Sequence, residues 1–266
     1  MSPIPNWVRD LQGSCQGKLL GREMIYLESA DSTNRQARGK ALRGAPEGLV
    51  VIADSQTQGK GRMGRTWISP PGVNVYFSIV LQPSIPPPRA PQITLLAGIS
   101  CAQALIKVTG LDPRLKWPND IFLNGKKAAG ILAEMEGERS DLHFVVVGIG
   151  INVNWAGEDI PLDLRETTTS LRAETGREFS RALIASEVLA ELERNYALFL
   201  AEGFSERMRQ EWNALSGMKE KWATVSFLDQ KISGKILGLD TDGALLLLDE
   251  EGNTQRFLVG DVRLRM

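Results

Sequence analysis

The sequence has 266 residues, 42% of them hydrophobic and 24% charged, which is ordinary for a globular protein with room for one large and one small domain. The net charge of −1 gives no overall attraction to nucleic acid or an anionic membrane, and a single histidine argues against a multi-histidine metal site. Two widely separated cysteines indicate reduced thiols in a cytoplasmic protein, with neither a signal peptide nor an apolar run near the ~18 residues of a spanning helix.

The first half of the chain alternates between strand-like and helix-like segments. The strand-like segments are short apolar runs, some of them rich in β-branched residues, and the helix-like segments have helical spacing or follow capping residues. The pattern predicts strands at 24–27, 49–53 and 73–81, and helices at 7–11, 35–43 and 94–108.

Four polar residues precede the second of these helices: Asp31, Ser32, Thr33 and Asn34. Each is a good helix N-cap, so capping alone accounts for them. The alternative is that free backbone N–H groups and hydroxyls at this helix start hold a polar ligand. The residues themselves leave both interpretations open.

A loop rich in glycine and cations follows the strand at 49–53. Glycine lets backbone N–H groups approach an anion, and the Lys and Arg side chains of residues 59–65 add charge, so the loop predicts a phosphate or carboxylate site. The G-x-G-x-x-G spacing at 59–64 is not a dinucleotide fingerprint, because Pro70, Pro71 and Gly72 preclude the long helix that such a fingerprint requires. Alternation of small and basic residues disfavours a merely solvated basic loop.

A hairpin is predicted in the middle of the chain. Asn124-Gly125 is a strong turn signal that should join strands at 121–123 and 127–135. Small residues after Lys127 leave room for a larger group to pack against the second strand. Glu134 and Glu136 on that strand are expected to be exposed.

The strand predicted at 142–154 carries two different faces. Alternate residues from Val145 to Val153 are apolar and should pack on the core. The opposite face has glycine at 148 and 150, followed by Asn152 and Asn154. This face predicts either a floor on which a ligand lies close to the backbone or a glycine bend in the strand.

The last third of the chain changes character. Ser180 should cap a long amphipathic helix, and a second helix is predicted at 204–215. From about residue 219, four or five short strands separated by Asp-Gly and Glu-Gly turns suggest a small β-barrel. We therefore predict a large domain at 1–218 and a small one at 219–266.

Five motifs, in this order, resemble the biotin protein ligases over roughly residues 22–266. None is specific alone, but together they identify the chain as similar to that family. They are Asp31-Ser32-Thr33-Asn34, the loop 58–67, Lys116-Trp117-Pro118-Asn119-Asp120, Lys127-Ala128-Ala129-Gly130-Ile131-Leu132 and Gly148-Ile149-Gly150-Ile151-Asn152-Val153.

The resemblance implies an α+β fold, a mixed sheet flanked by helices related to class II aminoacyl-tRNA synthetases, with a C-terminal SH3-like barrel. It implies a biotin and biotinyl-adenylate site, in which Lys127 and Arg62 are the catalytic residues. The implied biotin and adenylate ligands are Ser32, Thr33, Asn34, Gln56, Gly59, Lys60, Gly61, Arg62, Lys127 and Gly130. Those implied near the nucleotide are Arg65, Trp67, Asn119, Asp120 and Asn152.

The activity implied by the resemblance has two steps. Biotin and ATP react, with Mg²⁺, to give biotinyl-5′-AMP, and biotin then passes to a lysine of a biotin carboxyl carrier domain. With only about 20 residues before the core, a DNA-binding role is not expected; the metal ligands are not predicted, and the sequence is compatible with a homodimer. Lys60 replaces an arginine of many members, which keeps the charge but loses the bidentate fork.

Two alternatives stay open at this point. A lipoate or octanoate ligase would share the core, but it would lack the arginine–glycine loop and the Lys-Trp-Pro-Asn-Asp run. A non-catalytic regulator would bind biotin or a nucleotide without turnover. We also expect residues 56–66 to be mobile in the empty protein and to close over the adenylate.

Overall fold

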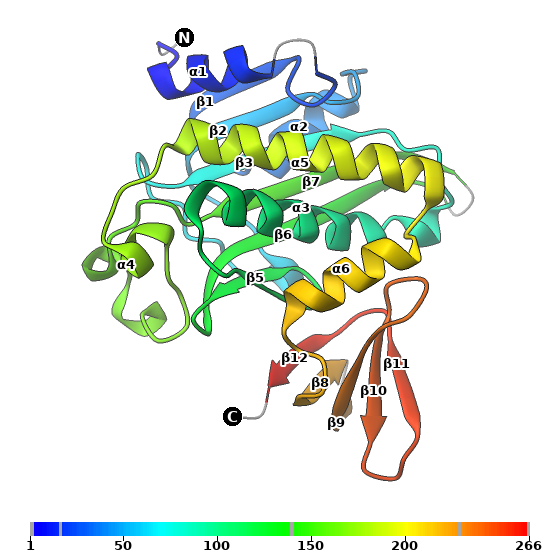
Figure 1. The fold of residues 1–266 in the computed structure, drawn as a ribbon. Coiled ribbons are helices and arrows are strands. Elements are labelled where there is room, and N and C mark those ends of the chain that lie inside the picture. The colour runs from blue at the N-terminus through cyan, green and yellow to red at the C-terminus, as the bar shows by residue number, and fades with distance from the viewer. Residues whose placement is uncertain (1–2, 16–17, 139–140, 228–229, 265–266) are drawn as a thin grey trace.

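The computed structural model describes residues 3–15, 18–138, 141–227 and 230–264. Its large domain is built on a seven-stranded sheet in the order β1-β2-β3-β7-β6-β5-β4 (Figure 1). β1 and β2 pair in parallel and the other neighbours pair antiparallel, which confirms the predicted mixed sheet. The strands are β1 (Met24–Ala30), β2 (Val50–Gln56), β3 (Val75–Leu81), β4 (Arg114–Lys116), β5 (Asp120–Leu123), β6 (Lys126–Gly137) and β7 (Leu142–Ile151).

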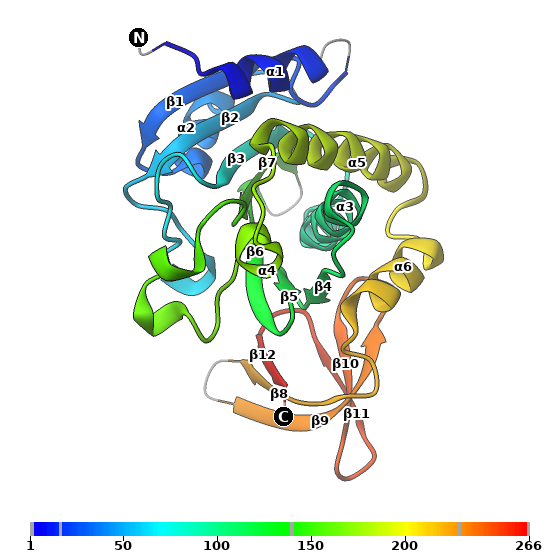
Figure 2. The ribbon, with the colours of Figure 1, turned by 60° about the vertical axis from the view of Figure 1, so that its left-hand side comes forward.

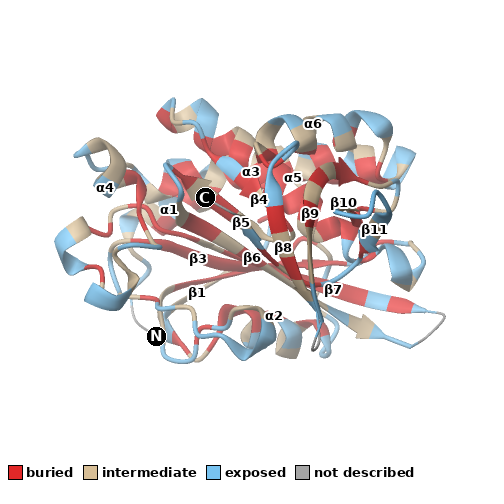
Figure 3. Cartoon of the chain, turned by 90° about the horizontal axis from the view of Figure 1, so that it is seen from below, coloured by how far each residue is buried: buried red, intermediate tan, exposed pale blue. Residues whose placement is uncertain are grey.

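Helices cover the two faces of this sheet unequally. The long helices α3 and α5 lie side by side over one face, with α1 beside α5, while α2 packs on the opposite face (Figures 1 and 3). The helices are α1 (Asn6–Ser14), α2 (Thr33–Ala41), α3 (Gln92–Thr109), α4 (Leu171–Thr175), α5 (Arg181–Glu202) and α6 (Glu206–Ser216). Short 3₁₀ turns occur at Arg62–Gly64, Pro87–Arg89, Gly157–Asp159 and Leu162–Leu164.

The two faces of β7 lead to different surroundings, as its alternation predicts. Val145, Val147 and Ile149 join the main core beneath α3 and α5. Phe144 and Val146 join a smaller apolar cluster beneath α2. Gly148 and Gly150 continue this second face, with Gly148 buried under Asn34 at the start of α2 and Gly150 only partly buried. The glycines of β7 therefore let other parts of the chain approach the backbone of this strand closely.

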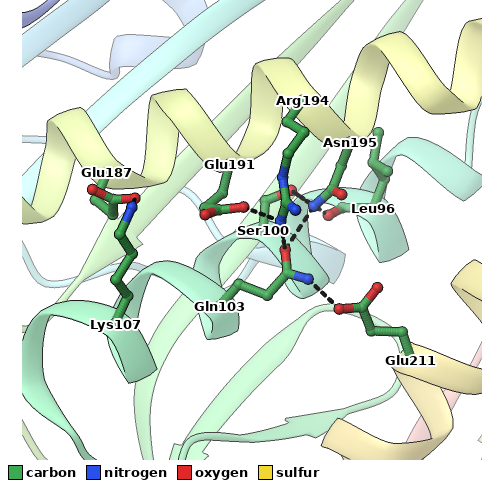
Figure 4. Close-up of polar contacts among 9 residues, drawn as sticks. All are labelled: Leu96, Ser100, Gln103, Lys107, Glu187, Glu191, Arg194, Asn195 and Glu211. Atoms are coloured by element: carbon green, nitrogen blue, oxygen red, sulfur yellow. Dashed lines mark hydrogen bonds and ion pairs between the residues drawn. The ribbon is translucent and has the colours of Figure 1, made fainter.

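A polar cluster joins α3, α5 and α6 on the opposite face (Figure 4). Asn195 of α5 donates to Ser100 Oγ at 3.0 Å and to Gln103 Oε1 at 2.8 Å, both on α3. Gln103 in turn donates to Glu211 of α6. Ser100 and Asn195 are buried, so these bonds satisfy polar groups that would otherwise cost stability. The cluster fixes how the three helices pack.

Helix α3 corrects the expectation that no segment could span a membrane. By length and composition alone, residues Pro87–Thr109 are apolar enough to cross one. However, 72% of the apolar window is buried, between the sheet and α5. Its apolar residues therefore belong to the protein core, and the helix ends at Gly110, whose φ of 71° is left-handed.

The C-terminal strands form a separate five-stranded antiparallel sheet in the order β11-β10-β9-β8-β12, and this small domain has the predicted SH3-like character. It lies against the β4–β5 end of the large sheet (Figure 2). The indole Nε1 of Trp117, a buried residue, donates to Gly243 O at 3.2 Å across this interface. The strands are β8 (Trp222–Phe227), β9 (Gln230–Leu239), β10 (Leu245–Asp249), β11 (Thr254–Phe257) and β12 (Asp261–Leu264).

Candidate active site

A cavity of about 110 Å³ lies on the open face of the large sheet, beside the N-terminus of α2. The walls come from α2, the glycine loop, β5, β6, β7 and the start of β12. Thirteen of the predicted site residues line it: Ser32, Thr33, Asn34, Gln56, Lys60, Gly61, Arg62, Arg65, Trp67, Asn119, Asp120, Lys127 and Gly130.

Two predicted site residues do not line this cavity. Gly59 is buried, and a Cβ there would lie 2.3 Å from Trp67 O. Glycine at this position therefore lets the two ends of the loop pack closely against each other. Asn152 is 1% exposed and donates from Nδ2 to Thr169 O at 2.9 Å, which anchors the segment before α4. Their direct contact with a ligand stays a prediction.

The start of α2 is not a simple capping motif. Ser32 is the N-cap residue, yet its side chain makes no capping hydrogen bond. Thr33 N instead donates to Gln56 Oε1 at 2.8 Å, which ties the helix start to the end of β2. Ser32, Thr33 and Asn34 are all buried, and each lines the cavity. This favours the interpretation in which the motif holds a ligand.

Trp67 covers the glycines on the floor of the cavity. Gly130 of β6 and Gly150 of β7 are directly paired neighbours in the sheet. A Cβ on Gly150 would lie 2.6 Å from Trp67 Nε1, and one on Gly130 would lie 3.1 Å from Trp67 Cζ3. Glycine at 150 therefore leaves the room that the indole occupies, and glycine at 130 avoids a tight contact with the same ring. The predicted close approach to the backbone is made here by the chain's own tryptophan.

A β-bulge aims Lys127 into the cavity. Ile121 pairs with Ala129, whereas Phe122 pairs with Lys127, so β6 has one extra residue at this point. Ala128 and Ala129 are consequently both buried in the core, and the following alternation is shifted by one position. Lys127 thus shares a face with Gly130, and its Nζ lies 2.7 Å from Asp120 Oδ1 and 5.2 Å from the centre of the Trp67 ring.

The glycine loop is attached to the C-terminal domain. Arg65 forms an ion pair with Asp261, and Arg62 donates to Gly260 O at 3.4 Å and to Asn119 Oδ1 at 3.3 Å. Burial lowers the pKa of the Arg62 guanidinium, while the nearby carboxylate of Asp120 raises it. A half-buried guanidinium with only long hydrogen bonds is well placed to bind an anion more strongly.

Sequence reasoning missed several residues in and around this site. Asp261 lines the cavity from the other domain, and its position cannot be read from local pattern. Glu134 is half-buried and accepts from Asn34 Nδ2 at 2.7 Å, and Glu136 pairs with Arg38, so the expected exposure of both was wrong. Ser78 is fully buried beneath the start of α2.

The donor set fits a metal ion that arrives with phosphate. Among the described residues, no group of three or more His, Cys, Asp or Glu side chains could hold a metal ion by itself. Asp120 places one carboxylate in the cavity. Mg²⁺ commonly takes one or two carboxylates, several waters and substrate phosphate oxygens, and this arrangement meets that requirement.

Comparison with protein families identifies both domains. Residues 26–152 match the biotin/lipoate A/B protein ligase family, and residues 224–265 match the biotin protein ligase C terminal domain. The bifunctional ligase/repressor BirA of Bacillus subtilis is 39% identical over 237 residues, which is 88% of this chain and 72% of that protein. The biotin–[acetyl-CoA-carboxylase] ligase of Paracoccus denitrificans is 33% identical over 233 residues, 85% of this chain and 94% of that one.

A solved structure agrees in fold with both domains. The biotin protein ligase from Aquifex aeolicus, in complex with biotin and ATP, has a TM-score of 0.78 and is 31% identical, covering 92% of this chain and 99% of that one. A lipoate ligase is disfavoured, since the C-terminal match is specific to biotin ligases. The chain belongs to the biotin/lipoate A/B protein ligase family, and within it to the biotin protein ligases.

Proposed function

We propose that this protein joins biotin to ATP, giving biotinyl-5′-AMP and pyrophosphate, and then transfers the biotin to a lysine of a biotin carboxyl carrier domain. The observation that carries the proposal is the gathering of Lys60, Arg62, Arg65 and Lys127 around one cavity that is also lined by uncharged hydrogen-bonding side chains, those of Ser32, Thr33, Asn34 and Gln56. A ligand with a neutral polar ring at one end and phosphate at the other matches this division.

The first step needs charge neutralisation more than proton transfer. A carboxylate is ionised at neutral pH and attacks the α-phosphorus directly, while pyrophosphate leaves. Lys127 and Arg62 are assigned to the negative charge that builds on the phosphate oxygens. The ion pair with Asp120 keeps the Lys127 ammonium in place until the phosphate arrives. Mg²⁺, when bound with ATP, would neutralise further phosphate charge, with Asp120 as the protein carboxylate.

The two ends of the ligand are assigned to different walls. The biotin ring is assigned to the α2 end, with Ser32, Thr33, Asn34 and Gln56. The nucleotide is assigned to the wall formed by Asn119, Asp120, Arg65 and Trp67, whose indole offers a flat surface for the base. Lys60 and Gly61 lie between them in the loop.

In the second step the amine of the carrier lysine attacks the acyl carbon, and AMP leaves. The attacking amine must first lose a proton. Asp120 forms an ion pair with Lys127, so we assign Asp120 to holding Lys127. A cytoplasmic location is part of the proposal, supported by two buried free thiols, Cys15 and Cys101.

Biotin-dependent exchange of labelled pyrophosphate into ATP tests the first step, and labelling of a carrier domain tests the second. Exchange with biotin but not with lipoate or octanoate is expected. Exchange driven by lipoate would replace the proposal with the alternative ligase. Binding of biotin and ATP with no exchange would leave a non-catalytic regulator.

A further inference from the structure

Beside the cavity lies a half-buried cation that the mechanism above does not use: Lys116, the last residue of β4. We propose that Lys116 is a further catalytic residue, which binds the pyrophosphate as it leaves the α-phosphate of ATP. The inference rests on the proposed function, because pyrophosphate is the leaving group of the first step proposed for this site, and it gives that leaving group a binding residue of its own.

The register of the sheet places Lys116 on the cavity face. Lys116 pairs directly with Asp120 of β5, and Asp120 pairs with Gly130 of β6. Gly130 in turn pairs with Gly150 of β7. Directly paired residues of neighbouring strands lie on the same face, so these four form one row across the sheet. The last three line the cavity, and Lys116 continues the row by one strand, to the edge of the sheet.

The Lys116 ammonium group is available to an anion. Its Nζ lies 5.0 Å from the centre of the Phe122 ring, and it makes no hydrogen bond or ion pair with any residue that the structure describes. The neighbouring ammonium group of Lys127, by contrast, is paired with Asp120. A half-buried ammonium group without an acceptor costs free energy, and phosphate oxygens would remove that cost.

The charges around Lys116 favour an anion with several charges. Burial lowers the pKa of the Lys116 ammonium group, the Asp120 carboxylate raises it, and the positive charges of Lys127 and Arg65 lower it. Three cations therefore lie within electrostatic reach of one another around one carboxylate. Their mutual repulsion is relieved more by pyrophosphate than by a singly charged anion.

The order of residues across the sheet matches an in-line displacement. Helix α2 packs on β2, β3 and β7, so the carboxylate of biotin approaches from that side, and Lys127 on β6 is assigned to the α-phosphate. As the new bond forms, the bond from the α-phosphorus to the bridging oxygen breaks on the opposite side, and both electrons leave with that oxygen. Negative charge therefore grows on the side away from α2, where Lys116 lies one strand beyond Asp120.

Two variants separate the charge of Lys116 from its bulk. Lys116→Met removes the charge and keeps an unbranched side chain over Phe122, whereas Lys116→Arg keeps the charge. In biotin-dependent ATP–pyrophosphate exchange, Lys116→Met should raise the KM for pyrophosphate about tenfold or more, the usual effect of losing a bond to a charged group. The KM for biotin should stay close to that of the unchanged protein, and Lys116→Arg should recover most of the affinity for pyrophosphate.

The second step is the internal reference, because no pyrophosphate takes part in it. Transfer of biotin from added biotinyl-5′-AMP to a carrier domain should run in Lys116→Met at the rate of the unchanged protein. Lys126→Met is the matched control, since Lys126 is also half-buried but its Nζ already donates to Arg165 O. It should keep the KM for pyrophosphate of the unchanged protein.

The possible results separate this inference from the proposed function. An unchanged KM for pyrophosphate in Lys116→Met overturns the inference and leaves the proposed function standing. A fall in transfer from added biotinyl-5′-AMP in both variants, with that KM unchanged, also overturns it and moves Lys116 to the second step. An equal rise in KM in Lys126→Met would assign the effect to a general loss of positive charge and overturn it as well. Absence of biotin-dependent exchange in the unchanged protein removes the proposed function and this inference together.

Discussion

Lys127 and its neighbour Lys126 show how much the direction of a side chain matters at residue scale. Lys127 Nζ lies in the cavity beside Asp120, whereas Lys126 Nζ donates to Arg165 O at 2.7 Å, and Lys126 does not line the cavity. The two lysines are adjacent in sequence and equal in charge. Comparison of their alanine variants therefore separates a site-specific role from a general loss of positive charge.

We expect Lys127→Ala to reduce biotin-dependent ATP–pyrophosphate exchange by about 10²–10³-fold, the usual cost of removing one donor from a charge-stabilising site. Lys126→Ala should stay within a few-fold of the unchanged protein. Both are measured by the same exchange assay at saturating biotin. Near-normal exchange by Lys127→Ala would remove this residue from the mechanism.

Gly148 gives a second prediction at this scale. An alanine Cβ would lie 1.9 Å from Asn34 Oδ1, so Gly148→Ala must displace the Asn34 amide from its partners. We expect a loss of about 1–3 kcal/mol in unfolding free energy, from buried polar groups left unpaired, and weaker biotin binding. Denaturant melts and calorimetric titration measure the two effects.

Gly13→Ala is the control for that substitution. Gly13 lies in α1, and a methyl group added there would have nothing within 4 Å, so alanine should be neutral or slightly stabilising. If both variants kept full stability and biotin affinity, the close approach of Asn34 to Gly148 would have no energetic importance.

The residue scale also shows how far the sequence could be interpreted. The resemblance of five motifs to the biotin protein ligases predicted thirteen residues that line one cavity, whereas the residue pattern alone predicted only an anion site in the glycine loop. The burial of Glu134 was not predicted, because alternation along β6 placed this residue on a strand face that was expected to be exposed. Its partner Asn34 lies far away in the sequence. Ser78 and Asp261 depend on contacts between distant segments, for which a single sequence has no local signal.

At the scale of elements, we expect the glycine loop to be mobile in the empty protein and to become ordered when biotin and ATP bind. Met63 is 72% exposed with φ 56°, and the hydrogen bonds that Arg62 makes to Asn119 and Gly260 are long, at 3.3 and 3.4 Å. Phosphate would add charge-assisted hydrogen bonds to Arg62 and Arg65 and so hold the loop more firmly. We expect trypsin to cut within residues 60–65 quickly in the empty protein and slowly with biotin and ATP.

Equal cutting rates with and without both ligands would contradict that loop closure. Biotin alone and ATP alone are the informative intermediate conditions. The rate at sites in the C-terminal domain serves as the internal reference, because ligand binding should change it less.

Helix α3 gives a prediction about thiol chemistry. Burial raises the pKa of the Cys101 thiol to about 12, so the reactive thiolate is scarce in the folded protein below that pH. Stability linked to this thiol is complete below the pKa of an unfolded cysteine and is lost as pH rises toward about 12. Cys101 should therefore resist a thiol reagent at pH 8 and react at once in denaturant; fast labelling of the native protein would contradict its burial.

At the scale of the whole molecule, the two domains share one site and one interface. Arg65 and Asp261 connect the glycine loop to β12, and Trp117 connects the end of β4 to Gly243 in the C-terminal domain. The short elements β4 and α4 were not predicted. The other strands of the large sheet and both domains were predictable, because strand and turn signals are strong in each. Their mutual placement was not, since it depends on a few side chains far apart in the chain.

Trp117→Phe keeps most of the buried volume and removes the bond to Gly243 O. We expect a loss of about 1–3 kcal/mol, because the carbonyl is left buried without that donor, and a calorimetric transition that begins to separate into two. Trp7→Phe is the control, since the buried Nε1 of Trp7 has no hydrogen-bond partner in the described part of the chain. Equal destabilisation by the two variants would mean that the interdomain bond adds nothing.

The bulge in β6 has a consequence for how this chain tolerates changes of length. Residues Asn124 and Gly125 form an exposed turn, where an added residue would ordinarily be absorbed. Between Lys127 and Gly130, removal of one alanine would remove the bulge and leave the two residues two positions apart, on the same cavity face of the strand. Both changes of length should therefore leave the Lys127 ammonium group on the cavity face of β6 in a protein that still folds.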